Sequence, residues 1–356
     1  MKKTKTCFRC LAFVIPLACL ACAPEATRLT TGPGPEDLVR VRSNRGDAIV
    51  TASVKRSLFT GLSEQGRIEL CRIGKGQEFH TVFEGGNCDT FPFYPAGISY
   101  VEHSTAAGFA GKSLLYVTNE IRQTVEVFEV RGEKIRFLTS LGKFPTTTQP
   151  NGIAAFPDGS VYVSVMRPFP SKENPQVVIQ QAVDTSNTVL AYQPPEGGGE
   201  EGRWSTCITG INGANGLAAG PGGRSLLVCA WHSKKVWSFA RSPKTRELVR
   251  EKPIELFKDL AFHPDNIKRM SEGRYELCGQ TNFPATALHM ITGLPVSHGG
   301  WISFVWDGKN LRSTDRTALI KGHRRAPSTA LLIDGKAYAG QPIAAGVFVS
   351  PVADQR

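Results

Sequence analysis

The chain has 356 residues, of which 41% are hydrophobic and 21% are charged, an ordinary composition for a soluble globular protein. Its formal net charge of +11 is modest for this length. No Lys/Arg stripe is interleaved with aromatic residues, so nucleic acid is not expected as a partner. The 36 glycines and 23 prolines indicate many turns, as in an all-β protein built from short strands.

The first 21 residues differ from the rest of the chain. Residues 1–10 carry four basic side chains and no acidic one, and residues 11–21 form an apolar run too short to span a bilayer comfortably. This pattern predicts a secretion signal, and therefore an exported protein of the periplasm or cell envelope. Cys22 follows Leu20 and Ala21 as at a lipoprotein processing site, which would leave a lipid anchor as the one membrane contact. Ordinary signal-peptidase cleavage nearby is the alternative.

From residue 36 onward one pattern recurs six times: a polar residue or pair, Ile or Leu, an apolar run, a Gly turn and a second strand. The clearest copies read P-N-G-I-A-A-F-P-D-G at 150–159 and A-N-G-L-A-A-G-P-G-G at 214–223. The six copies begin at Glu36, Ala96, Asn151, Asn215, Asp265 and Ser328. A repeat of this length indicates an array of similar structural units.

Each repeat has room for four short strands. Residues 67–73, 124–130, 188–192 and 234–240 alternate in polarity and are rich in β-branched residues, as strands are. Four strands in about 50–60 residues is the size of a propeller blade, and radial closure protects the sheet edges. We therefore predict a six-bladed β-propeller over residues 33–352. A pair of β-sandwiches is the alternative, but it would not explain why the same motif opens each repeat. We call the polar residue or pair that opens a repeat the repeat head.

Closure of the ring is expected through residues 47–53, completing the last blade beside the C-terminal strands. Three longer segments, 167–184, 194–202 and 283–300, are expected as loops; the first could also form a short helix or a covering flap. Five cysteines follow Cys22 without a CxxC pair. Their spacing argues against a zinc site and allows one or two disulfides in an oxidising compartment.

In a propeller the first strand of each blade lines the central tunnel, so the repeat heads should converge on the axis. The polar candidates there are Glu36, Asp37, Asn151, Asn215, Asp265 and Asn266, while the second and sixth heads offer Ala96 and Ser328. Carboxylate and amide oxygens are the donors that Ca²⁺ prefers, and the lack of His or Cys at these heads disfavours zinc or copper. We predict one shared calcium site. The alternative is that each Asn-Gly pair is a simple turn.

Several ordered motifs resemble the paraoxonase/arylesterase family. They are E-D-L at 36–38, F-Y-P-A-G-I-S at 93–99, P-N-G-I, A-N-G-L with S-K-K-V-W-S-F, and P-D-N-I. The wider superfamily of calcium-dependent phosphotriesterase-like propellers includes gluconolactonase and strictosidine-synthase-like branches, and H-P-D-N-I-K-R at 263–269 is similar to the latter.

The resemblance runs from about residue 33 to 352 and implies a catalytic calcium held by Glu36, Asn151, Asn215, Asp265 and Asn266. It also implies that this ion binds the carbonyl or phosphoryl oxygen of the substrate and stabilises the oxyanion during hydrolysis of a lactone or ester.

The sequence departs from that family at three places. Paraoxonases carry a His before the G-I-S motif and a second His before the T-V-E-V-F-like strand, where this chain has Ala96 and Asn119. Their second, structural calcium uses an Asp where this chain has Gly152, so that Asp37 and the Ile98 carbonyl are the ligands that remain. Their terminal disulfide lacks a C-terminal cysteine here.

His263 stands two residues before Asp265 and is the candidate base for a proton of calcium-bound water; a solvated loop histidine is the alternative. The sequence holds no G-x-S-x-G elbow, H-E-x-x-H motif or Gly-rich phosphate loop before a helix. The leading hypothesis is a calcium-dependent hydrolase of small lactones or aryl esters. A strictosidine-synthase-like enzyme, which condenses an amine with an aldehyde, and a non-catalytic, calcium-stabilised binding propeller stay open.

Overall fold

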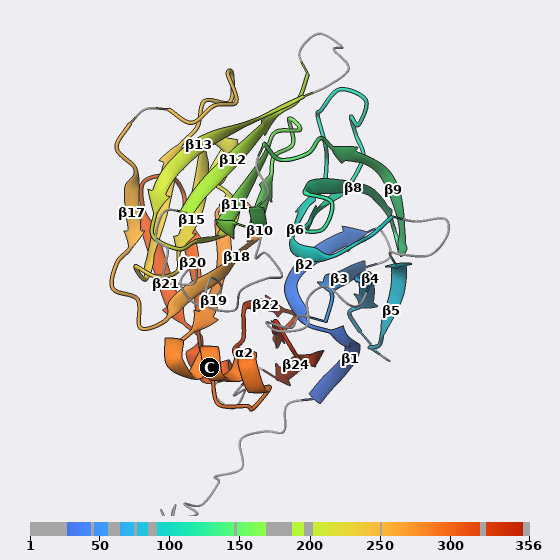
Figure 1. The fold of residues 1–356 in the computed structure, drawn as a ribbon, viewed down its shortest axis with the longest axis vertical. Helices are drawn as coiled ribbons and strands as arrows, with labels where there is room; N and C mark the ends of the chain where they lie inside the picture. The colour runs from blue at the N-terminus through green and yellow to red at the C-terminus, as the bar shows by residue number, and fades with distance from the viewer. Residues whose placement is uncertain are drawn as a thin grey trace, which may run out of the picture.

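The strands of the computed structural model form six four-stranded antiparallel sheets arranged as propeller blades around one axis (Figure 1). The structure describes residues 27–43, 46–55, 65–74, 77–84, 91–145, 148–168, 187–195, 202–249, 251–320 and 325–351. The six-bladed β-propeller predicted from the repeats is therefore confirmed.

Five blades are each built from four strands that follow one another in the chain. Blade 1 contains β2 (Pro35–Ser43), β3 (Gly46–Ser53), β4 (Arg67–Arg72) and β5 (Phe79–Glu84). Blade 2 contains β6 (Pro95–Val101), β7 (Leu114–Asn119), β8 (Thr124–Arg131) and β9 (Lys134–Leu141). Blade 3 contains β10 (Thr148–Ala155), β11 (Val161–Pro168), β12 (Asn187–Gln193) and β13 (Arg203–Ile211).

Blades 4 and 5 are built in the same way, from four consecutive strands each. Blade 4 contains β14 (Ala214–Ala219), β15 (Ser225–Ala230), β16 (Lys235–Ala240) and β17 (Ile254–Phe257). Blade 5 contains β18 (His263–Ser271), β19 (Arg274–Gln280), β20 (Gly299–Trp306) and β21 (Leu311–Asp315). Short 3₁₀ turns cover Pro221–Gly223 and Thr317–Ile320.

Blade 6 joins the two ends of the described chain. It contains β22 (Thr329–Ile333), β23 (Lys336–Gly340) and β24 (Ala345–Pro351), and its outer strand is β1 (Thr27–Pro33). Leu29 of β1 stands opposite Val347 of β24. Closure through the N-terminal region is thus observed, but the strand expected for it was wrong: residues 47–53 lie in β3, between β2 and β4. The short, polar β1 has too little apolar alternation to be recognised without its partner strand.

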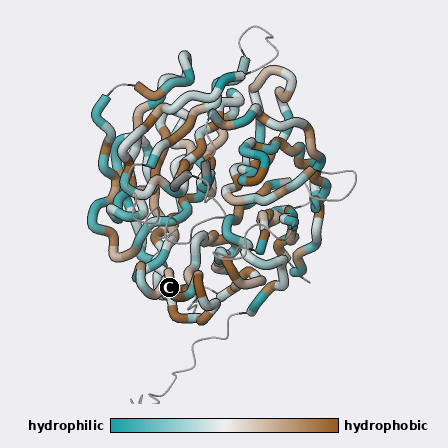
Figure 2. The backbone as a smooth tube through the Cα atoms, viewed as in Figure 1, coloured by the Kyte–Doolittle hydropathy of each residue, from teal (hydrophilic) through white to brown (hydrophobic). Residues whose placement is uncertain are grey.

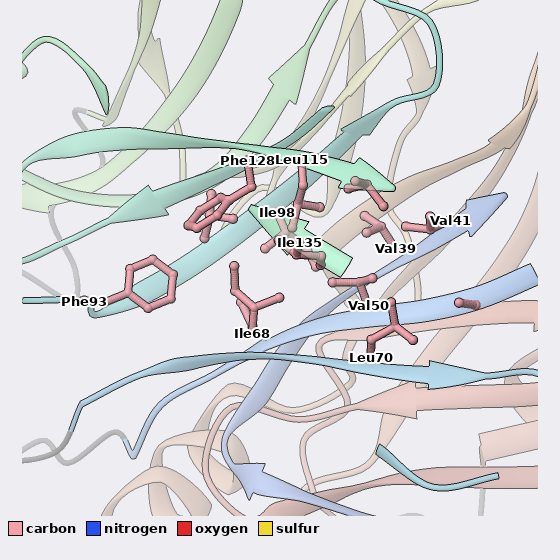
Figure 3. Close-up of a cluster of buried hydrophobic side chains, with 14 residues drawn as sticks. Val39, Val41, Val50, Ile68, Leu70, Phe93, Ile98, Leu115, Phe128 and Ile135 are labelled. Carbon is pink, nitrogen blue, oxygen red and sulfur yellow. The ribbon is translucent and has the colours of Figure 1, made fainter. Parts of the chain in front are cut away.

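The hydrophobic core lies between neighbouring blades. Figure 3 shows one such layer, where Val39, Val50 and Ile68 of blade 1 meet Ile98 and Phe128 of blade 2, all of them buried. Hydrophobic and hydrophilic residues alternate along much of the chain (Figure 2). Each blade is therefore stabilised by burying apolar side chains against the next one.

One segment expected as a loop is partly helical. Helix α2 (Phe283–Thr292) begins where the Asn282 Oδ1 accepts a hydrogen bond of 3.0 Å from Ala285 N, and it ends at Gly293, whose φ of 73° suits a C-terminal cap. The cap residues and the proline after Asn282 are the usual helix start and stop signals. The prediction of a loop over all of 283–300 was wrong. The apolar pattern of this segment is too weak to predict a helix, and the signals at its two ends mark the helix instead.

Several sequence expectations fall outside the described residues. These are the predicted signal at 1–21 with Cys22, most of the segments 167–184 and 194–202, and Cys88. In the ranges that are described, Cys71, Cys207, Cys229 and Cys278 are free thiols. No helix within those ranges combines the length and apolarity needed to cross a membrane.

Candidate metal centre

The repeat heads lie in the strands that surround the axis. The first strands of neighbouring blades contact one another all around the ring. In β10, Pro150 pairs with Val165 and Ile153 pairs with Val163. Two residues of β10 therefore lie between these pairs where β11 has only one, so β10 carries an extra residue at its head. The same irregularity occurs at the heads of β2, β6, β14 and β18. A bulge of this kind redirects a side chain, and here it recurs at five heads.

The glycines that follow the heads are required by close approach of the next blade. A Cβ would lie 2.2 Å from a backbone carbonyl oxygen at Gly97, 2.3 Å at Gly152 and 2.3 Å at Gly216. These oxygens belong, in order, to Asn151, Asn215 and Asp265. Both Asn-Gly pairs therefore sit inside strands, and the simple-turn alternative is wrong for Asn151 and Asn215. Their glycines allow neighbouring heads to touch.

Hydrogen bonds close the other half of the ring. Ile98 N donates to Asp37 Oδ2 over 2.8 Å, linking blades 1 and 2. Asn266 N donates to Ser328 O over 3.0 Å, and Ser328 Oγ donates to Glu36 O over 2.6 Å. Every pair of adjacent heads is thus in contact, which holds their polar groups around one point of the axis.

All five residues predicted as metal ligands lie on this ring. Glu36, Asn215, Asp265 and Asn266 are buried and Asn151 is half-buried. On the ring, the buried acceptors Asn215 Oδ1 and Asp265 Oδ1 have no hydrogen-bond partner among the described residues, as is also true of Asn212 Oδ1 and Gln341 Oε1 elsewhere. The neighbouring Asn215 side chain nevertheless acts to lower the pKa of Asp265. Buried acceptors are normally satisfied, so these two oxygens are candidate ligands for a cation.

The two carboxylates of the ring interact through space. Burial, and after it the negative charge of Glu36, raise the pKa of Asp265 to about 8. A hydrogen bond from Gln280 acts in the opposite direction. Two buried acids that disfavour each other's ionised form would both be stabilised by a divalent cation.

A network that the sequence did not reveal orients Asp265. Gln280 Nε2 donates to Asp265 Oδ2 over 2.6 Å, and Trp231 Nε1 donates to Gln280 Oε1 over 2.8 Å. Gln280 also donates to Pro327 O over 3.2 Å. Oδ2 of Asp265 is thereby held by the protein, while Oδ1 has no hydrogen-bond partner among the described residues. Gln280 is brought there by pairing of β18 with β19, and no local pattern marks it.

The candidate base His263 begins β18 and is half-buried. Its ring lies 4.5 Å from that of Trp231, and its Nδ1 is 2.9 Å from Trp231 O. Because a carbonyl only accepts, Nδ1 carries the proton and Nε2 of the neutral ring is an acceptor. Burial lowers the pKa of His263. The residue is therefore not a solvated loop histidine.

The positions that hold histidines in paraoxonases carry no base here. Ala96 is buried in β6, and Asn119 ends β7 opposite Pro95. Asn119 Oδ1 accepts from Tyr94 N over 3.1 Å, while its Nδ2 donates to Pro92 O over 2.9 Å and to Glu126 Oε1 over 3.0 Å. The Asn119 amide is thus engaged with two backbone groups and the Glu126 side chain.

The donor set suits a hard cation. Within the described ranges, no three or more His, Cys, Asp and Glu residues gather as a metal site. The ring instead combines two carboxylates with three amides, all oxygen donors. Such a set fits Ca²⁺ and is poor for zinc or copper.

Comparisons with known proteins agree with the fold. No protein-family model and no curated protein matches the chain. It is similar to solved structures of a luciferin-regenerating enzyme (9% identity, TM-score 0.52, 91% of this chain and 95% of that one) and of a candidate gluconolactonase (12%, 0.50, 92% of each). A third is regucalcin, a calcium-binding protein from Agrobacterium tumefaciens (9%, 0.50, 92% of this chain and 96% of that one).

At these identities the likeness shows the fold alone. The chain is a six-bladed propeller with a ring of polar heads on its axis. Its neighbours in structure are gluconolactonase-like and regucalcin-like propellers, and none of them singles out the paraoxonase family.

Proposed function

We propose that the protein is a calcium-dependent hydrolase of lactones or aryl esters whose ion is held on the propeller axis. The observation that carries the proposal is the ring of oxygen donors from four blades, with buried acceptors at Asn215 and Asp265 that lack a donor in the described part of the chain. Two proteins of the same fold are named for calcium binding and as a candidate gluconolactonase, which fits this direction.

The ligands of the ion would be Glu36, Asn151, Asn215, Asp265 and Asn266. A calcium ion bound there would polarise a substrate carbonyl and stabilise negative charge on its oxygen. The chain's own residues prepare the site: Gln280 orients Asp265, and the ring glycines bring the donors together without intervening side chains.

His263 is proposed to accept the proton of the attacking water. Its Nδ1 hydrogen bond to Trp231 O sets the tautomer that leaves Nε2 as acceptor. The Trp231 ring packs against the His263 ring at an interplanar angle of 30°, and His263 lies two residues from Asp265 on the same strand. Proton transfer by a positioned side chain contributes about 10²–10⁴-fold to a rate.

Calcium-dependent melting tests the metal site. The wild-type protein should melt higher in CaCl₂ than in chelator, since ligand binding adds about 2.7 kcal/mol at a hundredfold excess over Kd. Asn215→Ala removes a donor and should lose most of this difference. Asn212→Ala is the matched control, because Asn212-Gly213 is a true turn with a Gly213 φ of 80°. If Asn215→Ala and Asn212→Ala respond to calcium as the wild type does, the site is wrong.

Hydrolysis assays test the activity. Lactones and aryl esters should be hydrolysed in CaCl₂ and not in chelator, and His263→Gln should lower kcat by about 10²-fold or more. His232→Gln, beside the same Trp231 ring, should leave kcat near wild type. Equal rates for His263→Gln and wild type would remove His263 from the mechanism.

A second candidate is a non-catalytic propeller that binds calcium and a small ligand. The observation that favours it is the loss of a base at Ala96 and Asn119, since Asn119 is committed to structural hydrogen bonds. Calcium-dependent melting without turnover of any lactone or aryl ester would support this candidate over the hydrolase.

A further inference from the structure

A lysine crosses the propeller axis. Lys268 belongs to β18 of blade 5, and its Nζ lies 2.5 Å from Asp37 Oδ2 of blade 1 and 3.0 Å from Ile98 O of blade 2. Blades 2 and 5 stand on opposite sides of a six-membered ring. A side chain that links them therefore occupies the centre of the tunnel.

The ammonium group is enclosed by acceptors. The side chains of Lys268 and Asp37 are 7% and 1% exposed. Asp37 Oδ2 also accepts from Ile98 N over 2.8 Å, and Asp37 Oδ1 accepts from Leu38 N over 3.0 Å. Asp37 thus has a cation and two backbone donors, which offset part of the cost of burying its carboxylate.

The same acceptors are those left for a second calcium. The family resemblance implies a structural ion bound by Asp37, the Ile98 carbonyl and an acid at the position of Gly152. Lys268 Nζ contacts the first two. A side chain at position 152 would begin 2.3 Å from Asn215 O, so no acid can stand there without a backbone shift. The residues present do not fit a second divalent ion.

We propose that Lys268 is a built-in cation that takes the place of a second axial metal ion. Its charge neutralises Asp37 and ties β18 to β2 and β6, as an ion between the blades would. Because the cation is covalently attached, this link does not depend on calcium concentration. Lys268 is a positioning residue: it shares β18 with Asp265 and Asn266 and holds that strand across the axis from its partners.

A double-mutant cycle in chelator tests the internal cation. Lys268→Met and Asp37→Asn each leave one buried polar partner uncompensated, so each should lower the melting temperature by several degrees or more. The double variant removes both charges and should melt above the less stable of the two single variants. Lys235→Met is the control, since its pair with Glu255 is about 30% exposed (32% and 28%), and it should melt near wild type.

Additive effects of Lys268→Met and Asp37→Asn, or a Lys268→Met protein as stable as wild type, would overturn the proposal. Because the cycle is run without metal, its result does not depend on the proposed calcium site. If the single variants fail to fold, the double variant can still be compared with the wild type. A soluble, folded double variant would show that the protein tolerates loss of both charges but not of one, which supports the charge pair.

The number of calcium ions bound per chain provides a second measurement, by native mass spectrometry of the wild-type protein in CaCl₂. The proposal expects no more than one ion, and two tightly bound ions would overturn it. A count of zero would contradict the proposed function, while the Lys268 cation would remain supported by the cycle.

Discussion

At the scale of single residues, the smallest side chains determine the geometry of the candidate site. Gly97, Gly152 and Gly216 have no Cβ, and so three successive blades can place the carbonyl of one head against the next. None of these glycines adopts the left-handed conformation. Their role is close packing of backbones, in contrast to Gly213, which has a positive φ in a turn.

Gly152→Ala should therefore destabilise the protein. The new Cβ would lie 2.3 Å from Asn215 O and 2.8 Å from Gly216 Cα, both backbone atoms that cannot rotate away. Overpacking of this kind costs about 1–3 kcal/mol, and the midpoint of urea unfolding measures it. Gly142→Ala is the matched control, because nothing lies within 4 Å of a Cβ there. Equal midpoints for both variants would mean that the inner ring is loosely packed.

At the scale of elements, adjacent blades are joined by polar contacts as well as by apolar packing. Arg241 follows β16 in blade 4 and reaches the β10–β11 turn of blade 3. Its Nη2 lies 2.6 Å from Asp158 Oδ2 and 2.5 Å from Ser160 Oγ, and its guanidinium carbon is 4.1 Å from the Phe156 ring centre. The Arg241 side chain is 1% exposed, so this contact belongs to the interior of the blade interface.

Arg241→Ala should cost about 3–5 kcal/mol in urea unfolding, since it leaves a partly buried carboxylate without its cation. Arg72→Ala, whose ion pair with Glu133 has side chains 47% and 40% exposed, should cost less than about 1 kcal/mol. A loss at Arg241 no larger than at Arg72 would contradict a structural role for the contact.

The pH dependence of stability offers an independent readout of the same contact. Burial raises the pKa of Asp158, but hydrogen bonds from Ser160 and Arg241 outweigh it, and the net pKa is lowered. A lowered folded-state pKa gives stability that is present above the ordinary pKa of about 4 and is lost as pH falls through the folded-state value. Arg241→Ala should reduce this loss below pH ~4.

At the scale of the whole molecule, closure of the ring depends on one short strand. β1 completes blade 6 by pairing with β24, and its Leu29 packs in the cluster that contains Leu38, Tyr338 and Val347. Arg28 Nη2 also donates to Ala345 O over 2.6 Å. The first and last strands of the described chain are thereby held together in one sheet, which closes the ring.

Leu29→Ala should lower the unfolding free energy by about 2–4 kcal/mol, the usual cost of removing a buried leucine side chain. Amide exchange in β24 should become faster in the same variant, because opening of β1 exposes the neighbouring strand. Thr30→Ala is the control, since Thr30 is exposed on the other face of β1. Unchanged exchange in β24 with Leu29→Ala would show that β1 does not hold the closure.

The sequence by itself determined the number of blades and the set of ring residues. Both follow from local patterns repeated in equivalent positions. Glu36, Asn151, Asn215 and Asp265 each open a repeat, Asn266 directly follows Asp265, and the first strands of the blades meet at the axis of the ring. What those side chains bind remains a prediction, since donor types alone do not measure affinity.

Only the tertiary structure decided which residues meet across the ring. β1 pairs with a strand more than 300 residues away, Gln280 reaches Asp265 through sheet pairing, and Lys268 contacts Asp37 from a blade that is not its neighbour. These contacts depend on how six sheets close in space. The spacing of residues along the chain encodes each blade, whereas the curvature of the whole ring brings distant side chains to one point.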